Sequence, residues 1–408
     1  METQVDALDK HLMQHYIARD DSRQAPSYPV LRAPQMAIPT RVVGVGMKAK
    51  WTRILAFSCA AVVLLLLTLS CHDEGPGPVS TDWQFAGGII FELNAGSLAN
   101  GICVIDPSEV NPTTHPVLRG AAEPRLSPDG KKVLQRRLPG NTLDLFVSNL
   151  DGTDAHNLTN TDQTISESDG DWAPDMQRVV CHALFYPTYR EAIRVVSLDG
   201  TAAHNITDTN RVRTANYPRW SPDGTKIAYL AQDTLGGLWW LTVIAADGSN
   251  EQRVGQQTSL VAPVWSPDGR SLAWAGAPNQ GLLVFDFAVG HSVALEEGAR
   301  ARDALTCWLP DSRLIFSRSV AGGSYQVKVA SFSPTIRVDS LAAGFNTLDG
   351  MVLSPKKDHL VLFARREGET ALSLYLMALD GSGLSRVGTV DPSAQARLPT
   401  NGSISWVE

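Results

Sequence analysis

The sequence lacks the short motifs that commit a chain to a known catalytic mechanism. It has no Gly-x-Ser-x-Gly nucleophile turn, no His-Glu-x-x-His zinc helix, no glycine-rich phosphate loop ending in Lys-Ser/Thr and no Cys-x-x-Cys pair. Each of these motifs fixes a nucleophile, a metal or a phosphate in a set geometry. We therefore expect a protein that binds a partner rather than an enzyme.

Basic charge is also scarce. Of the 408 residues, 19% are charged and 43% are hydrophobic, which is enough apolar material for a core and too little charge for a disordered chain. From His72 onward there are 27 Lys and Arg against 37 Asp and Glu. A nucleic-acid partner is not expected, because binding phosphates requires a basic surface.

The five cysteines do not form a disulfide framework. Cys59 and Cys71 lie in or at the end of a hydrophobic run near the N-terminus. Cys103, Cys181 and Cys307 stand singly in apolar stretches far apart in the sequence. We expect these three to be buried thiols.

An export signal is predicted at residues 47–71. Three basic residues after Met47 precede the uncharged run Ile54–Leu69, and Ser70 and Cys71 follow it. A run of 16 residues is at or just below the roughly 17 to 25 that span a hydrocarbon core, which favours a cleaved signal peptide over a retained membrane anchor. The retained anchor remains the alternative.

Residues 67–71 resemble a lipobox, in which a cysteine is acylated before cleavage. The resemblance makes Cys71 the candidate lipidation site, although Thr68 occupies the place where a leucine is usual. A plain signal anchor that happens to contain a cysteine is the alternative. If Cys71 is acylated, His72 in place of Asp favours an outer-membrane lipoprotein over an inner-membrane one.

The segments on either side of the signal are expected to be unstructured. Residues 1–46 contain four prolines, mixed charges and no sustained periodicity, so they are either a disordered tail or a misassigned start, with Met47 as the true beginning. Residues 72–87 are expected to be a linker, since Gly and Pro are frequent from His72 to Val79. The folded part is then 88–408.

A four-residue phrase recurs along this folded part. Ser-Pro-Asp-Gly follows Leu126, Trp220 and Trp265. Degenerate copies of the phrase, which we call worn copies, follow the equivalent residue in other repeats. We call this preceding residue the repeat anchor; the anchors are Leu126, Trp172, Trp220, Trp265, Trp308, Leu353 and Trp406. Their spacings of 46, 48, 45, 43, 45 and 53 residues are close to the roughly 40 to 45 of a four-stranded propeller blade.

The turn chemistry supports hairpins at each copy. Pro presets the first corner of a type I turn, Asp accepts local backbone hydrogen bonds, and Gly allows the exit conformation. We therefore assign a structural role in the turns to Asp129, Asp175, Asp223, Asp268 and Asp311. A second signal, Asp-Gly at residues 151, 199, 247 and 380, predicts a type I′ hairpin within each repeat.

These residues resemble the WD40-like repeats with a Pro-Asp-Gly turn that are found in TolB-type periplasmic propellers. The resemblance covers nearly all of residues 88–408 and rests on phrase, period and copy number together. TolB itself carries an α/β domain ahead of its propeller, for which this sequence has no equivalent. The partners of that domain therefore cannot be transferred.

The predicted fold is all-β: a seven-bladed propeller of four-stranded antiparallel blades. Residues 88–92 and 102–105 supply strands of a first blade, and residues 404–407 supply an innermost strand with nothing after it. Pairing the two ends of the chain would remove the exposed sheet edges. Six blades with a loose N-terminal hairpin is the alternative.

Few residues suggest chemistry. One acidic cluster, Glu167, Asp169 and Asp171, is expected on a loop at the mouth of the central channel. These hard oxygen ligands have a spacing that can hold calcium. The simpler interpretation is a solvated acidic loop. His156 and His204 occupy equivalent repeat positions, which repetition alone explains. Among the tryptophans, the anchors are expected in the core, and one of Trp239 and Trp240 could be exposed to a partner.

The leading functional hypothesis is a monomeric, membrane-tethered binding or scaffold module for a protein, cell-wall or small-molecule ligand. The resemblance also implies an alternative, since related propellers include polysaccharide lyases and lactonases with a metal at the channel mouth. A further alternative is a propeller that gates a separate hydrolase. All three place the protein in the cell envelope, in the periplasm or on the outer surface.

Overall fold

The computed structural model of the protein describes residues 88–93, 101–109, 114–161, 163–209, 214–232, 237–257, 261–276, 281–295, 306–320, 323–333, 335–391 and 404–407. The chain divides into two units, Met1–His72 and Asp73–Glu408, and every described residue belongs to the second. Cys71, the segments 1–46 and 47–71 and the linker 72–87 lie outside the described residues. Within the described ranges no helix has the length and apolarity needed to cross a membrane.

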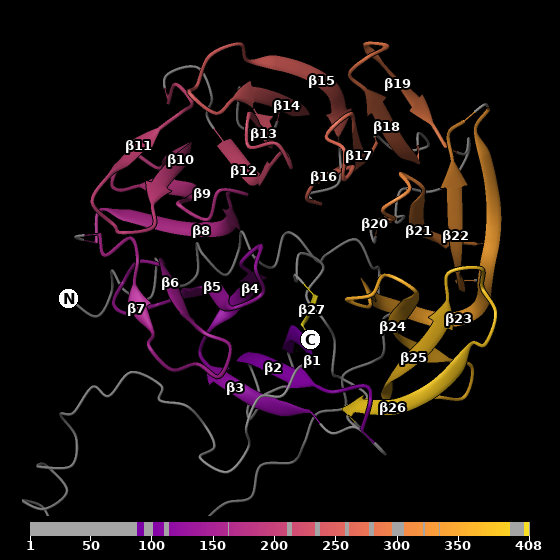
Figure 1. The fold of residues 1–408 in the computed structure, drawn as a ribbon. Coiled ribbons are helices and arrows are strands. Elements are labelled where there is room, and N and C mark those ends of the chain that lie inside the picture. The colour runs from indigo at the N-terminus through magenta and orange to yellow at the C-terminus, as the bar shows by residue number, and fades with distance from the viewer. Residues whose placement is uncertain are drawn as a thin grey trace, which may run out of the picture. The chain divides into compact units, whose positions relative to one another are not determined.

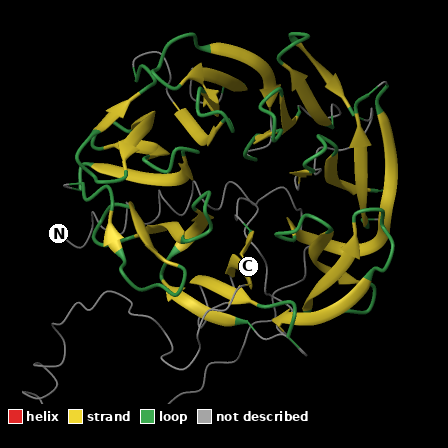
Figure 2. Ribbon diagram, viewed as in Figure 1, coloured by secondary structure: helices red, strands yellow, loops and turns green. Residues whose placement is uncertain are grey.

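The described residues are built from strands β1 to β27, and the turns between them are short (Figure 2). Four sheets follow one another along the chain: β4(Ala122–Leu126), β5(Lys132–Arg137), β6(Asp144–Asn149), β7(His156–Asn157); β8(Ile165–Trp172), β9(Arg178–Phe185), β10(Arg190–Ser197), β11(Ala203–Asn205); β12(Thr214–Trp220), β13(Lys226–Gln232), β14(Trp239–Ala245), β15(Gln252–Gln257); and β16(Val264–Trp265), β17(Ser271–Ala275), β18(Leu282–Asp286), β19(His291–Ala294). Each is antiparallel and keeps sequence order.

Two further sheets depart from this pattern. A seven-stranded sheet contains β20(Thr306–Trp308), β21(Leu314–Ser319), β22(Tyr325–Ser331), β23(Arg337–Leu353), β24(His359–Arg366), β25(Leu372–Ala378) and β26(Ser385–Asp391). The other has the order β27(Ser405–Val407), β1(Gly88–Leu93), β2(Gly101–Ile105), β3(His115–Arg119), so that strands from opposite ends of the chain pair. The predicted all-β antiparallel class is confirmed.

The 17-residue strand β23 explains the seven-stranded sheet. Its first half, from Arg337 to Phe345, pairs with β22, and its second half, from Phe345 to Leu353, pairs with β24. One continuous strand therefore serves as the outer strand of one repeat and the inner strand of the next. The sheets lie around a common centre, with β4, β12, β16, β20 and β27 nearest to it (Figure 1).

The Ser-Pro-Asp-Gly turns join the first and second strands of their sheets. In the first copy the hydroxyl of Ser127 donates to Asp129 Oδ1 at 2.6 Å and accepts the backbone N–H of Lys132 at 2.9 Å. This hydrogen bond from Ser127, followed by the backbone N–H of Lys131, holds the pKa of Asp129 below its usual value. The same Ser–Asp contact, 2.6 Å long, recurs at Asp223 and Asp268.

The worn copies keep the turn with different hydrogen bonds. Asp175 accepts the backbone N–H of Gln177 at 2.8 Å and the guanidinium of Arg178, and Asp311 accepts the backbone N–H of Arg313 at 3.2 Å. Neither has a serine two residues earlier to bind. In the lysine-containing copy, the hydroxyl of Ser354 reaches Asp358 instead, at 2.7 Å.

The prediction of type I′ turns at the Asp-Gly pairs was wrong. In the first pair Gly152 has φ of 82°, but Asp151 has no positive φ, whereas a type I′ turn needs two such residues. The N–H of Gly152 bonds to the carbonyl of Asn149 at 3.0 Å, which makes a type I turn followed by a left-handed glycine. The carboxylate of Asp151 accepts the N–H and the hydroxyl of Thr153, which favours this form.

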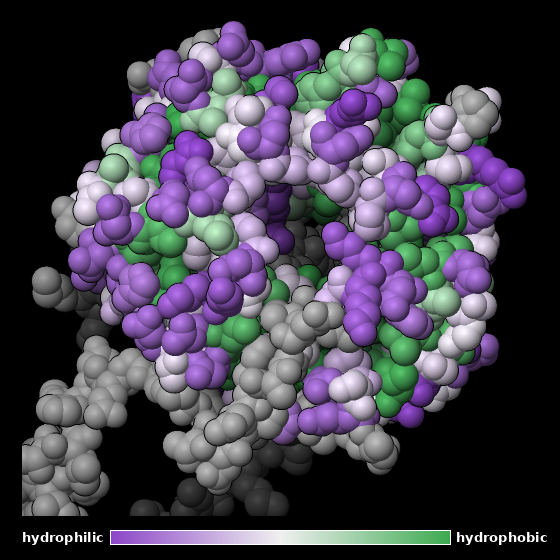
Figure 3. Space-filling view, in the orientation of Figure 1, coloured by the Kyte–Doolittle hydropathy of each residue, from purple (hydrophilic) through white to green (hydrophobic). Residues whose placement is uncertain are grey.

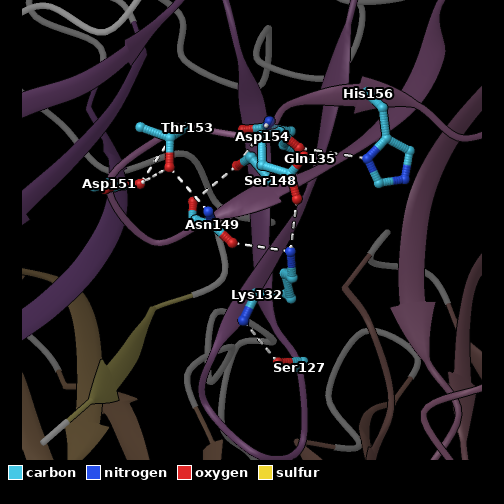
Figure 4. A network of polar contacts seen from close by, with 9 residues as sticks. All are labelled: Ser127, Lys132, Gln135, Ser148, Asn149, Asp151, Thr153, Asp154 and His156. Atoms are coloured by element: carbon cyan, nitrogen blue, oxygen red, sulfur yellow. Dashed lines mark hydrogen bonds and ion pairs between the residues drawn. The ribbon is translucent and has the colours of Figure 1, made fainter.

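Polar side chains link the two kinds of turn within one sheet (Figure 4). The ammonium of Lys132 contacts Asn149 Oδ1 at 2.8 Å and Asp154 Oδ2 at 3.1 Å, and Asn149 in turn donates to the hydroxyl of Thr153. Lys132 follows the first turn and Asn149 precedes the second. Both turns therefore lie at one end of the sheet, and the loop between the second and third strands lies at the other.

Neighbouring sheets pack through their apolar faces and through the tryptophan anchors. The indole N–H of Trp172 donates to the carbonyl of Arg125 on the preceding sheet at 3.0 Å, and Trp265 and Trp308 make the equivalent bond, of 3.1 and 3.0 Å, to Arg219 and Val264. All three side chains are buried, as the repeat predicted.

Two other expectations from the sequence had mixed outcomes. Cys103 and Cys181 are buried thiols as predicted, whereas Cys307 is half-buried. Of the adjacent tryptophans, neither is fully exposed: Trp239 packs against the apolar core and the guanidinium of Arg253 lies 5.1 Å from the ring centre of Trp240.

Candidate functional site

Three consecutive inner strands are interrupted by a β-bulge at the same repeat position. The register shifts lie within β4, β8 and β12, and in each the residue three places before the anchor has a left-handed backbone. These residues are Glu123, Asp169 and Tyr217, with φ of 56°, 53° and 55°. Non-glycine residues adopt this conformation rarely, and bulges of this kind re-aim side chains next to functional sites.

Glu167, Asp169 and Asp171 therefore do not lie on a loop, as the sequence suggested, but within β8 itself. The loop interpretation failed because the bulge breaks the strict alternation that identifies a strand. The side chain of Glu167 is fully buried, whereas Asp169 and Asp171 are half-buried.

The carboxylates of Glu167 and Asp171 have separate partners. Glu167 Oε2 accepts the hydroxyl of Thr161 at 3.2 Å, and Asp171 Oδ2 accepts the backbone N–H of Trp220 at 2.9 Å. In the described ranges no group of three or more His, Cys, Asp and Glu is placed to hold a metal ion. The calcium site suggested by the spacing is thus not assembled from these residues.

Around the bulges, a relay of hydrogen bonds from backbone N–H groups to carboxylates connects each sheet to the next. The N–H of Glu123 donates to Glu92 Oε2 at 2.8 Å, and the N–H of Asp169 donates to Glu123 Oε2, also at 2.8 Å. Burial, followed by the neighbouring carboxylate of Asp169, raises the pKa of Glu123 above its usual value. Arg136 opposes this effect, with its Nε 3.5 Å from Glu123 Oε1. The relay fixes the angle between sheets and gathers negative charge near the centre.

Two guanidinium groups accompany these carboxylates. Arg125 and Arg219 each directly precede a repeat anchor, and Asp171 holds the same position on the strand between them. The side chain of Arg219 is only 8% exposed, and among the described residues its guanidinium donates from Nη1 to the carbonyl of its own neighbour Pro218, at 2.6 Å. The guanidinium of Arg125 makes no hydrogen bond or short ion pair among the described residues, although it is half-buried.

The two arginines are close enough to influence each other. Burial, followed by the positive charge of Arg219, lowers the pKa of Arg125 to about 10, and Asp171 is the strongest group that opposes the shift. A partly buried guanidinium without a hydrogen bond among the described residues, such as that of Arg125, is unfavourable unless an anion reaches it.

This charged cluster, which we call the charged arc (Glu123, Arg125, Asp169, Asp171, Arg219), occupies only one side of the ring. The residues at the position of Arg125 on the remaining inner strands are uncharged: Val264, Cys307, Val352 and Ser405. The space-filling view shows a hollow at the centre of one face, with hydrophilic residues on part of its wall (Figure 3).

A second polar group lies between the sheets and has a structural role. The hydroxyl of Ser168 lies 3.0 Å from His182 Nδ1, and His182 Nε2 lies 3.3 Å from Glu191 Oε2. Glu191 also accepts the N–H of Ala215 on the next sheet, at 3.1 Å. His156 and His204 are exposed at the outer edge, far along their sheets from the inner strands.

Sequence reasoning found two of the five residues of the charged arc, Asp169 and Asp171. It missed Glu123, Arg125 and Arg219, because single charges in strand-like segments read as surface residues. A signal was present: both arginines directly precede a repeat anchor, so alignment of the repeats by their anchors places them on equivalent inner-strand positions.

A family model for the TolB beta propeller domain matches residues 185–401. The chain belongs to this family. No curated protein matches the chain at a meaningful level. This assignment agrees with the antiparallel sheets around a common centre, and it confirms the resemblance drawn from the Pro-Asp-Gly repeats.

Several solved structures are similar to the chain at low sequence identity. TolB from Acinetobacter baumannii is 17% identical, over 89% of this chain and 74% of that chain, with a TM-score of 0.44. An oligogalacturonate lyase in complex with manganese is 12% identical, over 74% of this chain and 85% of that chain, with a TM-score of 0.53. An oligogalacturonate lyase from Vibrio parahaemolyticus is 12% identical, over 76% and 90%, with a TM-score of 0.51. At these identities the likeness concerns the fold alone.

Proposed function

We propose that this TolB-family protein is an exported, membrane-tethered binding module of the cell envelope, and that its propeller captures an anionic ligand at the charged arc. The ligand would be a carboxylate-bearing protein segment, cell-wall fragment or small molecule. The observation that carries the proposal is the pair of partly buried guanidiniums: among the described residues that of Arg125 makes no hydrogen bond, and that of Arg219 bonds to the carbonyl of Pro218.

The propeller in this proposal has seven blades. The seven-stranded sheet divides at β23 into two blades, and the other sheets supply one each. The pairing of Ile89 with Trp406 and of Ile90 with Ser405 supports closure of the ring by the C-terminal strand. A closed ring is rigid, so that the inner strands hold their side chains in place without a ligand.

A carboxylate fits the arginines for a physical reason. Guanidinium groups offer paired N–H donors that match the two oxygens of a carboxylate, and such bonds are about twice as strong as neutral ones. Asp169 and Asp171 lie nearby and oppose the approach of any anion, so that only an anionic group in direct contact with the guanidiniums would bind. Glu123 adds to this selectivity.

The test is calorimetric titration of the full chain with succinate, compared between the wild type and two variants. We expect Arg219→Gln to weaken succinate binding at least about tenfold, because a bidentate charged contact is lost. The control, Arg337→Gln, removes an arginine whose side chain is 74% exposed and should leave the affinity unchanged. Equal affinity in all three proteins, or no binding to the wild type, contradicts the proposal.

Tethering through Cys71 is tested separately. Mass spectrometry of the protein purified from membranes is expected to show an acylated N-terminal Cys71 with residues 1–70 removed. A protein that retains residues 47–70 would favour the signal-anchor alternative. The lyase-type or lactonase-type alternative predicts stoichiometric metal in the same sample, and the hydrolase-gating alternative predicts a hydrolase recovered with it.

A further inference from the structure

The charged arc contains a carboxylate that has no partner of its own. Asp169 is half-buried, and among the described residues its carboxylate takes part in no hydrogen bond or ion pair. Only its backbone N–H is engaged, by Glu123 Oε2 at 2.8 Å. The carboxylate of Asp171, by contrast, accepts the backbone N–H of Trp220 at 2.9 Å. Asp169 is therefore the uncompensated negative charge of the arc.

The surroundings of Asp169 make this charge unfavourable. Burial, followed by the carboxylate of Asp169, raises the pKa of Glu123, so the two carboxylates lie close enough to repel each other. The cation beside them serves Glu123, since Arg136 Nε lies 3.5 Å from Glu123 Oε1. A half-buried carboxylate next to a second carboxylate is stabilised by a cation that reaches it.

The arc also contains an uncompensated positive charge. Burial, followed by Arg219, lowers the pKa of Arg125. The carboxylates of Asp171, Asp169 and Glu123, in this order, oppose the shift. They are thus within electrostatic range of Arg125, yet no ion pair joins Arg125 to any of them among the described residues. The arc presents two opposite charges that do not neutralise each other.

The backbone holds these two charges apart. Asp169 has a left-handed φ of 53° in the bulge of β8, and its N–H is fixed by Glu123. At the next residue, Gly170, a Cβ would lie 2.7 Å from Leu134 Cδ2, so β8 fits closely against the preceding sheet. The backbone of Asp169 is held on both sides, and its carboxylate does not move over to Arg125.

On the basis of the proposed function, we propose that the ligand of the charged arc is a small zwitterion, such as an amino acid or a short peptide. Its carboxylate binds Arg125 and Arg219, and its ammonium group binds Asp169. One molecule then satisfies both uncompensated charges. The ammonium group also offsets the repulsion that Asp169 and Asp171 exert on a lone anion.

Ligands of other charge types fit the arc less well. The second carboxylate of a dianion would face Asp169 and Glu123, which carry the same charge. A metal ion would be repelled by the guanidiniums, and within the part of the chain that the structure describes no group of three or more His, Cys, Asp and Glu is placed to hold one. Only a zwitterion meets both signs of charge at once.

The test is calorimetric titration of the full chain with two matched probes, 5-aminopentanoate and hexanoate. The two molecules have the same length and the same carboxylate, and a methyl group of hexanoate stands where 5-aminopentanoate has its ammonium group. We expect 5-aminopentanoate to bind about tenfold more tightly, because its ammonium group gains a charged hydrogen bond. Equal affinities, or tighter binding of hexanoate, would overturn the proposal.

The variant Asp169→Asn separates a ligand contact from a structural role. Asparagine adopts the left-handed conformation as readily as aspartate, so the bulge is kept and the melting temperature should not change. The affinity for 5-aminopentanoate should fall about tenfold, whereas that for hexanoate should rise, because the charge that attracts the ammonium group repels a lone anion. Equal weakening of both probes would point to a structural role and overturn the proposal. The control Asp339→Asn, at a side chain that is 49% exposed, should leave both affinities unchanged.

Failure of the proposed function is recognised separately with succinate and the variant Arg219→Gln. If succinate and hexanoate bind, both weaken in Arg219→Gln and the ammonium group brings no gain, the anion site stands and only the zwitterion is wrong. If none of the three probes binds, or if Arg219→Gln changes none of the affinities, both proposals fail together.

Discussion

The carboxyl group of Glu167 is fully buried on β8 without a full set of hydrogen-bond partners. Burial raises the pKa of Glu167 to about 7, and Arg194 is the strongest opposing charge. A raised pKa in the folded state means that the protonated form stabilises the fold. This contribution is fully present below the unfolded pKa of 4.5 and is lost as the pH rises through about 7.

Glu167→Gln should remove this pH dependence, because an amide has no charge to bury. The free energy of unfolding of the variant is expected to exceed that of the wild type by about 2–3 kcal/mol at about pH 8, and to differ little at about pH 5. Urea denaturation at the two pH values measures this. Glu367→Gln, at an exposed position, is the matched control. The same offset at both pH values would contradict the assignment.

At the residue scale, the sequence predicts positions better than environments. The turn aspartates and the buried tryptophans follow from the repeat, because the residues next to each position in the sequence determine both the turn and the apolar anchor. The burial of Glu167 and the isolation of Arg219 depend on the neighbouring sheet, whose approach cannot be read from the sequence around either residue. The bulge at Asp169 was missed although Gly170 lies within it, because no other residue there distinguishes a bulge from a loop.

At the element scale, the anchors decide how one sheet is joined to the next. Trp172 bonds through its indole N–H to the carbonyl of Arg125 on the preceding sheet, whereas the equivalent N–H of Trp220 is buried without a partner. The contact of Trp220 with the preceding sheet is made by its backbone N–H, which donates to the carboxylate of Asp171 at 2.9 Å. Both side chains are 6% exposed, so they are matched in burial.

This contrast predicts unequal effects of the same substitution. Trp172→Phe should lower the free energy of unfolding by about 1–2 kcal/mol more than Trp220→Phe does, because only the former leaves a buried carbonyl without its donor. The smaller ring costs packing in both variants, so the difference reports the hydrogen bond of Trp172 together with the loss of the unpaired N–H of Trp220 and the change in its contact with Arg178. Chemical denaturation of the two variants measures it. Equal losses would show that the indole bond adds nothing to the contact between sheets.

At the scale of the whole molecule, the pairing of β1 with β27 joins the two ends of the folded part. The repeat period predicted the succession of sheets, and the missing turn phrase before β1 predicted that this strand needs a partner from elsewhere. The continuous β23 was not predicted, because its two halves read as strands of separate repeats. The local sequence pattern does not reveal that the two halves of β23 run on without a turn between them.

The pairing makes the last residues decisive for stability and for the oligomeric state. Removal of residues 404–408 takes away the strand that covers β1 and the packing of Ile404 against the apolar core. We expect a loss of about 3 kcal/mol in the free energy of unfolding, from three strand positions and one apolar side chain. The uncovered edge of β1 should then pair with other molecules, so that light scattering detects larger oligomers than it does for the intact chain. A control that ends at Val407 keeps the strand and should behave as the intact chain. If the shortened protein is as stable and as monomeric as this control, the ring is not held by its C-terminal strand and the seven-bladed arrangement fails with it.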